Sequence, residues 1–290
     1  MTHNTQWASG RISPTMEGEL SKTELLVPER WDHVLALLNA RGRVRVEEIV
    51  GELGVSFTTA RRDLRQMHRQ GLVMRTRGGA VRPRHVGTDQ PLSRDRELQV
   101  LEKETIGKAA ALLIEPGDTL MSDGGTTAPW VYHYLPDMPI TVVTNSVEVG
   151  VRVAPKENVE LVWAGGMYDR KHNCLAGPLA ERQLQALRGD KAIVGAAGIS
   201  ARDGLTEPSA PMAEIKTIMI ERCNQCIVVA DHSKLGVGTL FSVVPIGRVD
   251  VIVTDKKADP ALLRDLRSAG VRVIIAEELL AEPPRRTPNS

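Results

Sequence analysis

The sequence has few cysteines, few aromatic residues and no long apolar run. Its 290 residues include three cysteines, Cys174, Cys223 and Cys226, and only 3% aromatic residues. An odd, low number of cysteines argues against a disulfide framework. No stretch of 18 or more apolar residues occurs, which excludes a transmembrane helix, and the first 26 residues lack the basic start and apolar core of a signal peptide. We therefore expect a cytoplasmic protein with no membrane partner.

Neither sign of charge dominates the chain, but the charge is unevenly distributed. The 37 basic and 36 acidic residues almost cancel. Residues 28–86, however, contain twelve Arg, no Lys and six acidic residues (+6), which leaves 25 basic and 30 acidic residues (−5) elsewhere. A small basic segment joined to a larger acidic one is typical of a nucleic-acid-binding protein with a separate regulatory part.

Composition and apolar patterning divide the chain into five segments. Thr, Ser, Gly and Asn predominate in the first, and Pro and charged residues interrupt the third, so we expect a flexible tail and a linker there. The predicted segments are a tail (1–26), a basic domain (27–82), a linker (83–100), an α/β domain (101–280) and a second tail (281–290).

The basic domain carries the pattern of three helices. Pro28 suits the first turn of a helix whose apolar face recurs at helical spacing through Leu38. A second helix is expected over 46–53, and Gly54 then provides a turn. Ser56 follows as a predicted N-cap of a third helix that ends near Gln70. A helix, a short glycine turn and a further helix have the spacing of a helix-turn-helix.

The third helix has one apolar and one basic face. At about 100° per residue, Ala60, Leu64 and Met67 share a narrow stripe that should face the core. The opposite face is mostly arginine, which suits DNA phosphates and guanine edges, although an isolated basic helix face is more often merely solvated. This outward face comprises Thr58, Arg62, Arg65 and Arg69, with Arg61 to one side.

A β-hairpin is predicted directly after this helix. Residues 72–75 form a short apolar run ending in Arg75, and Gly78 and Gly79 then make a turn before Ala80. The hairpin would be a wing, so the domain is predicted to be a winged helix-turn-helix that binds a double-stranded DNA operator. The residues expected to contact DNA are Ser56, Thr58, Thr59, Arg61, Arg62, Arg65, Arg75 and Arg77.

The basic domain resembles the signature of the DeoR family of bacterial transcriptional regulators. Two positions depart from that family's pattern: Ala60 replaces a branched apolar residue, and Arg77 stands where His is common. The motifs that carry the resemblance are Glu29-Arg30, Gly42-Arg43-Val44, Val55-Ser56, Arg61-Arg62-Asp63-Leu64, Gly71-Leu72 and Arg75-Thr76-Arg77-Gly78-Gly79-Ala80.

Beyond the linker, short apolar runs end in small or polar residues and alternate with helical patterns. This alternation predicts a mostly parallel, doubly wound sheet, the α/β class. In such sheets ligands bind beyond the carboxyl ends of the strands. The predicted strands lie at 118–122, 140–143, 159–163, 192–194, 227–229 and 249–253.

The loop from Asp123 to Thr127 is the most informative strand end. Gly124 and Gly125 allow close approach of the backbone, and Thr126 and Thr127 add hydroxyls before a helix, which favours a phosphate site. Asp123 would repel phosphate and is assigned to a sugar hydroxyl. A Gly-Gly-Thr-Thr run is more often a simple tight turn, but a second polar strand end, Thr144-Asn145-Ser146, makes a pocket more credible.

The resemblance to the DeoR family extends over about residues 105–275. The resemblance implies a domain similar in fold to ribose-5-phosphate isomerase and the CoA-transferase group. It also implies that this domain binds phosphorylated sugars or related metabolites, and that their binding relieves repression. Lys216 and Lys234 would add positive charge to the site, although a surface position is the ordinary expectation for lysine. The candidate effector-binding residues are Asp123, Gly124, Gly125, Thr126, Thr127, Thr144, Asn145, Ser146, Gly165, Gly166, Lys216, Asp231, Ser233 and Lys234.

A metal or redox site is not expected at Cys223-Asn224-Gln225-Cys226. A zinc site needs about four ligands, and the sequence has no second pair of cysteines. Cys174 and His232 could complete such a site, but nothing in their spacing requires it. Cys223 is placed at the end of a helix and Cys226 at the start of an apolar strand, rather than at an exposed helix N-terminus. We therefore expect structural cysteines, no metal and no cofactor.

The sequence is compatible with two functions and predicts an oligomer. The leading hypothesis is a repressor of carbohydrate-metabolism genes, controlled by a phosphorylated sugar. The alternative is an isomerase or transferase whose basic domain only tethers it to DNA, with Glu207, Glu214 and Asp231 as acid–base groups, but no matched acid–base pair can be placed. A homodimer or homotetramer, joined through the α/β domain, is expected because bacterial operators usually repeat.

Overall fold

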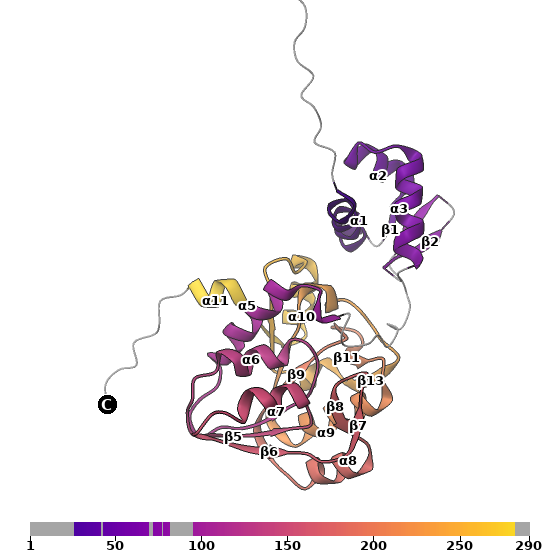
Figure 1. Ribbon diagram of the computed structural model, residues 1–290. Coiled ribbons are helices and arrows are strands. Elements are labelled where there is room, and N and C mark those ends of the chain that lie inside the picture. The colour runs from indigo at the N-terminus through magenta and orange to yellow at the C-terminus, as the bar shows by residue number, and fades with distance from the viewer. Residues whose placement is uncertain (1–25, 42, 70–71, 77, 82–94, 282–290) are drawn as a thin grey trace, which may run out of the picture. The chain divides into compact units, whose positions relative to one another are not determined.

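The computed structural model describes residues 26–41, 43–69, 72–76, 78–81 and 95–281. It divides into an N-terminal unit (Met1–Pro83) and a C-terminal unit (Arg84–Ser290), each with its own apolar core (Figure 1). The predicted end of the third helix, at Gln70, lies outside the described residues.

The N-terminal unit contains the predicted helices and hairpin, together with one strand that the sequence did not predict. That strand is β1, where Arg and Val alternate over three residues and only Val44 is buried. Gly54 adopts the expected left-handed turn, with φ 65°. The helices are α1 (Val27–Arg41), α2 (Val46–Leu53) and α3 (Phe57–Arg69), and the antiparallel sheet has the order β1 (Arg43–Arg45), β3 (Gly79–Val81), β2 (Met74–Thr76).

The C-terminal unit is built on a parallel sheet of seven strands, which confirms the predicted α/β class. All six predicted strands are present, and β15 at one edge is additional. The order across the sheet is β15 (Arg272–Ile275), β14 (Val251–Thr254), β12 (Cys223–Val229), β9 (Gly189–Gly195), β4 (Thr119–Ser122), β5 (Ile140–Thr144), β6 (Val159–Trp163).

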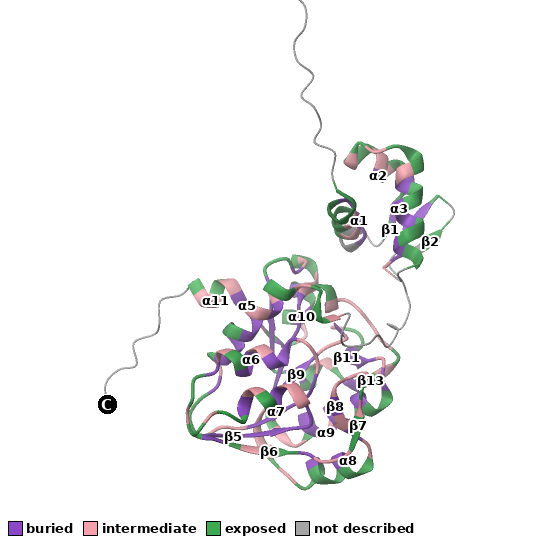
Figure 2. Cartoon of the chain, viewed as in Figure 1, coloured by how far each residue is buried: buried purple, intermediate pink, exposed green. Residues whose placement is uncertain are grey.

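Helices cover both faces of this sheet, and the strands are largely buried (Figure 2). Successive strand residues point to opposite faces, so Ile193 packs with one group of helices and Val194 with the other. One face carries α5 (Val100–Ala111), α6 (Ala128–Tyr134), α7 (Val147–Val153) and α11 (Ala276–Ala281); the other carries α8 (Pro178–Gln185), α9 (Ala210–Glu221) and α10 (Pro260–Ser268).

Short antiparallel elements that the sequence did not predict surround the carboxyl ends of the strands. Two short 3-10 helices accompany them, η1 (His232–Lys234) and η2 (Ile246–Arg248). The elements are the pair β7 (Met167–Asp169) and β8 (Cys174–Ala176), and the three-stranded sheet β10 (Gly198–Ser200), β11 (Gly204–Glu207) and β13 (Phe241–Val244).

The order of the strands reverses between β4 and β9. From β4 the chain adds β5 and β6 on one side, then returns to β9 beside β4 and continues outward through β12, β14 and β15. At such a reversal the loops leave two neighbouring parallel strands in opposite directions and open a crevice at their carboxyl ends. Asp123 follows β4 at this crevice, and its carboxylate accepts a hydrogen bond from the backbone N–H of Gly195, at the end of β9, at 3.0 Å.

Candidate DNA-binding surface and effector site

The outer face of α3 is the strongest candidate for contact with DNA. Ser56 precedes the helix and its Oγ accepts the N–H of Thr59 at 3.1 Å, which confirms the predicted cap. The predicted inward residues Ala60, Leu64 and Met67 are fully buried. The candidate DNA-contacting residues of this helix that lie exposed are Thr58, Arg61, Arg62 and Arg65, whereas Thr59 is half-buried.

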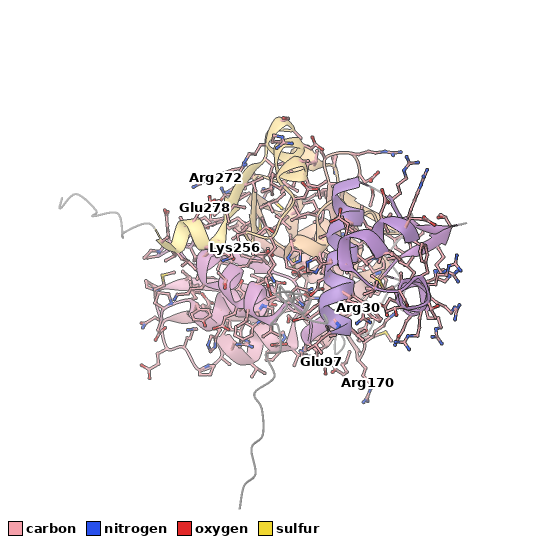
Figure 3. The ribbon with its side chains drawn as sticks, turned by 90° about the horizontal axis from the view of Figure 1, so that it is seen from above. Arg30, Glu97, Arg170, Lys256, Arg272 and Glu278 are labelled. Carbon is pink, nitrogen blue, oxygen red and sulfur yellow. The ribbon has the colours of Figure 1, made fainter. Side chains whose placement is uncertain are left out.

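A buried ion pair fixes α3 against α1. Arg30 lies on α1 (Figure 3), and its Nε donates to Asp63 Oδ2 at 2.8 Å while its second nitrogen donates to Oδ1 at 3.2 Å. Both side chains are almost fully buried. Such a two-point contact holds a planar guanidinium and a carboxylate in one orientation, so it sets the rotation of α3 and hence the direction of its arginine face.

The wing packs tightly against β1. A Cβ at Gly79 would lie 2.1 Å from the carbonyl oxygen of Val44, so only glycine fits there. Gly78, with φ 90°, makes the turn between β2 and β3. Arg75 is exposed on β2, as expected of a wing residue, while Arg77 lies outside the described residues.

In the C-terminal unit, three buried charged side chains meet where the order of the strands reverses. Lys216 of α9 is 7% exposed and forms ion pairs with Glu207 and with Asp123, the latter at 3.3 Å. Burial opposes the charge on Lys216, but the two carboxylates outweigh it and raise its pKa. Burial raises the pKa of Asp123 to about 6, against the opposing effect of Lys216. The lysine is therefore neutralised within the protein, and the cluster itself has no positive charge left for phosphate.

A second cluster of charged side chains lies close to Thr126. Lys234 Nζ donates to Asp95 Oδ1 at 2.8 Å, and Lys103 Nζ lies 3.0 Å from Asp95 Oδ2. The Thr126 hydroxyl donates to the same Oδ2 at 2.6 Å. Two ammonium groups, one hydroxyl and one carboxylate thus meet at this point, and we name the three donors, Lys103, Thr126 and Lys234, the cation cluster.

The two polar strand ends also provide internal hydrogen bonds. Thr144 Oγ1 donates to the Ser122 carbonyl at 2.8 Å and accepts the N–H of Ser146 at 3.0 Å. Ser146 in turn caps α7. Asn145 donates its amide to the Leu175 carbonyl at 2.9 Å, and its buried Oδ1 has no hydrogen-bond partner among the described residues.

Asp231 follows β12 and faces the cation cluster. Its Oδ1 accepts the N–H and the hydroxyl of Ser233, at 3.0 and 2.5 Å. Its Oδ2 is buried and, within the part of the chain that the structure describes, lacks a hydrogen-bond partner. An orphaned buried acceptor is unfavourable unless a ligand or water satisfies it, so Asp231 Oδ2 and Asn145 Oδ1 are candidate acceptors for a ligand hydroxyl or for water.

Three other candidate positions have structural surroundings that do not point to a ligand. Gly165 donates its N–H to the side chain of Gln183 on α8 at 2.6 Å. A Cβ at Gly166 would lie 2.7 Å from the Ala176 carbonyl on β8, a close approach of two backbones. Thr127 is buried before α6 and makes no capping hydrogen bond through its side chain.

The cysteines differ from expectation in one detail. Cys223 begins β12 instead of ending α9, because the helix stops at Glu221 and the strand is three residues longer at its start than its apolar part. Burial raises the pKa of the Cys174 and Cys223 thiols to about 12. Over residues 26–281, outside the gaps given above, no group of three or more His, Cys, Asp or Glu is placed to hold a metal ion, and no helix is long and apolar enough to span a membrane.

Lys103 and Asp95 were not predicted from the sequence as site residues. Lys103 is 1% exposed on α5. It precedes Ile106 and Ala110 by three and seven residues, the spacing of one helix face, so its burial could have been read from the pattern. For Asp95 the local sequence gives no such signal. Of the acid–base groups that an enzyme would need, Glu207 and Asp231 are buried but Glu214 is exposed.

Comparison with known proteins agrees with both units. The model of the DeoR C-terminal sensor domain matches residues 98–256, more than half of the chain, and that of the DeoR-like helix-turn-helix domain matches residues 30–86. The chain belongs to the DeoR family. It is 33% identical over 250 residues to the HTH-type transcriptional repressor GlcR of Bacillus subtilis, covering 86% of this chain and 96% of that protein.

Other DeoR-family relatives are equally regulators. The chain is 31% identical over 228 residues to the glycerol-3-phosphate regulon repressor of Escherichia coli, covering 78% of this chain and 90% of that protein. Among solved structures it is similar to ribose 5-phosphate isomerase A from Methanocaldococcus jannaschii, at 19% identity and a TM-score of 0.34, over 46% of this chain and 52% of that one. The chain is therefore a DNA-binding transcriptional regulator, and the alternative of an isomerase or transferase has no support.

Proposed function

We propose that this DeoR-family protein represses carbohydrate-metabolism genes and that a phosphorylated sugar, bound in the crevice of the C-terminal unit, releases it from its operator. One observation carries the effector proposal: Lys103, Thr126 and Lys234 already hold a carboxylate at the carboxyl ends of the strands, so the crevice is built to bind an anion. Two relatives are named as repressors, and the name of one of them, the glycerol-3-phosphate regulon repressor, refers to a phosphorylated compound, which supports this chemistry.

On the DNA side, Arg62 and Arg65 are assigned to base edges in the major groove and Arg75 and Arg77 to phosphates. The exposed arginine face of α3 supports this assignment for the first two, since guanidinium groups match the acceptors of guanine. Phosphate contacts make binding salt-dependent, so operator affinity should fall steeply as salt rises.

Within the effector site, the phosphate is assigned to Thr126 and Lys234, and the sugar hydroxyls to the unpartnered acceptors Asn145 Oδ1 and Asp231 Oδ2. Asp123 completes the site beside Lys216. A phosphate dianion gains from the two ammonium groups of the cation cluster, whereas the unphosphorylated sugar does not. The phosphate group therefore dominates recognition.

The active form is proposed to be a homodimer or homotetramer joined through the C-terminal unit. One winged helix contacts a short site, and paired units on repeated half-sites give the specificity that an operator needs. Sedimentation of the full chain with a two-half-site operator should show at least two chains per DNA, and a single bound chain would contradict this arrangement.

The experiment compares operator release by a phosphorylated sugar and by the same sugar without phosphate, measured by fluorescence anisotropy of labelled operator. We expect only the phosphorylated form to release the DNA and to be recovered unchanged. Thr126→Val should bind the operator normally but need more sugar phosphate for release. Thr105→Val is the matched control, because among the described residues the Thr105 hydroxyl donates to the Leu101 carbonyl of its own helix. A Thr126→Val protein that responds like wild type would remove the loop from the phosphate site.

A further inference from the structure

The carboxylate of Asp95 is bound by side chains from three separate parts of the C-terminal unit. Lys103 lies on α5, Thr126 in the loop after β4, and Lys234 on η1 after β12. Lys103 also donates to the backbone carbonyl of Asp95. Residues 95, 126 and 234 are far apart in sequence, and the side chains of Lys103 and Lys234 are 1% and 22% exposed, so this is a built site and not a chance surface pair.

Asp95 takes the position and makes the contacts that an effector phosphate needs. Its two oxygens accept one hydroxyl and two ammonium groups, the donor set that a phosphate monoester prefers. Burial opposes its ionisation, yet Lys234 and Lys103 prevail and hold the pKa of Asp95 well below its usual range. The carboxylate is therefore ionised at neutral pH and acts as an anion of the chain's own.

The short segment that carries Asp95 is held in a strained conformation. Gln99, immediately before α5, has φ 48° and ψ 41°, a left-handed conformation that residues other than glycine disfavour. Arg96, in the same segment, forms an ion pair with Glu148 on α7. The contacts of Asp95 and Arg96 hold residues 95–99 in place, so loss of the Asp95 contacts would free a segment that has strain to release.

We propose that Asp95 occupies the phosphate subsite of the ligand-free protein, and that an incoming phosphate group displaces it and frees residues 95–99. This inference rests on the proposed function and adds its mechanism of coupling. In the chain, residues 95–99 lie between the N-terminal unit, which ends at Pro83, and α5, so a ligand that releases them changes how the DNA-binding unit is tethered. The effector then has different affinities for two states of the protein, as a sensor requires.

Inorganic phosphate is the probe for competition, with binding to the full chain measured by calorimetry. If Asp95 occupies the subsite in about nine molecules of ten, removing it should tighten phosphate binding about tenfold. Asp95→Asn is the test variant. Glu97→Gln is the matched control, because Glu97 is an exposed carboxylate of the same segment (Figure 3) whereas, among the described residues, the cation cluster bonds to Asp95.

The result that overturns the inference is an Asp95→Asn protein that binds phosphate no more tightly than Glu97→Gln, or not at all. A double-variant cycle gives a second check. Because Thr126 bonds to both anions, Thr126→Val should weaken phosphate binding by about tenfold or more in the Asp95→Asn background. In wild type the weakening should be smaller, because the same substitution also weakens the competing contact with Asp95. Equal weakening in both backgrounds would show that Asp95 and phosphate do not share the hydroxyl.

Wild-type protein provides a test that does not depend on the variants folding. Amide hydrogen exchange of peptides covering residues 96–103 should become faster when inorganic phosphate saturates the chain, because the segment leaves its site. Unchanged or slower exchange would contradict displacement.

The failure of this inference is distinguishable from failure of the proposed function. A phosphorylated sugar that releases operator, together with an Asp95→Asn protein of unchanged phosphate affinity, would leave the repressor proposal and remove Asp95 from it. Tighter phosphate binding by Asp95→Asn, with no sugar phosphate able to release operator, would keep Asp95 in the phosphate subsite and refute the proposed release of the operator by a phosphorylated sugar.

Discussion

The buried pair of Arg30 and Asp63 offers the sharpest test of how the DNA-binding unit is held together. Asp63→Asn keeps the shape of the side chain but removes the negative charge that the buried guanidinium of Arg30 contacts. Both side chains are less than 10% exposed and are joined by two hydrogen bonds. Breaking a buried pair in this way typically costs about 3–5 kcal/mol.

That cost is large compared with the stability of the unit itself. At about 0.05–0.15 kcal/mol per residue, a domain of roughly 55 residues has a free energy of unfolding of about 3–8 kcal/mol. Asp63→Asn should therefore remove most of it and abolish operator binding, while the C-terminal unit stays folded. Replacing both partners by apolar residues, Arg30→Met with Asp63→Leu, should restore most of the loss, because no charge remains buried.

Hydrogen exchange of α3 amides in the full chain measures this directly. We expect protection in Asp63→Asn to fall about a hundredfold or more, at 1.4 kcal/mol for each factor of ten, and to recover in the double variant. Arg62→Ala is the matched control, since its exposed side chain should affect DNA binding and not exchange. An Asp63→Asn protein with wild-type protection would refute the structural role of the pair.

Three further predictions concern DNA contact, the effector loop and pH. Arg62→Ala should weaken operator binding by about 1–3 kcal/mol in an anisotropy titration, and unchanged affinity would remove that face of α3 from the interface. In urea unfolding, Gly124→Ala should be neutral or stabilising, because a Cβ at this position meets nothing closer than 3.7 Å. Gly125→Ala should destabilise the protein, because Gly125 has φ 108°. The opposite order of stabilities would contradict the loop geometry. Burial alone would lower the pKa of His232, but its bond to Asp255 outweighs burial, and the net pKa is raised. The charged His232 therefore stabilises the protein fully below about pH 6.5, and this stabilisation is lost as pH rises through the folded-state pKa. Burial opposes ionisation of Asp255, but its bond to His232 outweighs burial and lowers its pKa, so the stabilisation by the Asp255 carboxylate is lost on acidification. The stability of His232→Gln should therefore differ most from that of wild type in mildly acidic solution. A stability difference that does not depend on pH would disprove the linkage.

Much of the fold could be predicted because local patterns determine it. Apolar spacing placed Ala60, Leu64 and Met67 in the core of the N-terminal unit, and runs of apolar residues ending in polar ones located the parallel strands. The short strands β1, β7 and β10 were missed because three residues carry too little alternation to show a strand. They form only because a partner strand lies beside them.

The charged contacts of the site could not be predicted, because their partners are distant in sequence. Asp63 meets Arg30 across 33 residues and Asp95 meets Lys234 across 139. The proline-containing segment before α5 therefore looked like a simple linker. Lys216 was predicted as a site residue, with a surface position as the ordinary alternative, but its burial among carboxylates was not foreseen. Helix α9 is apolar on most sides, and the nearby carboxylates of Glu207 and Asp123 make the burial of Lys216 tolerable.

The central claim is that operator and phosphorylated sugar bind the same chain and oppose one another. The most direct measurement is the complete linkage cycle: the operator dissociation constant with and without the sugar phosphate, and the sugar-phosphate dissociation constant with and without operator. We predict that each ligand weakens the other by the same factor, between about 5-fold and 150-fold, because coupling between two sites is reciprocal. Operator affinity that does not change at saturating sugar phosphate would contradict the account.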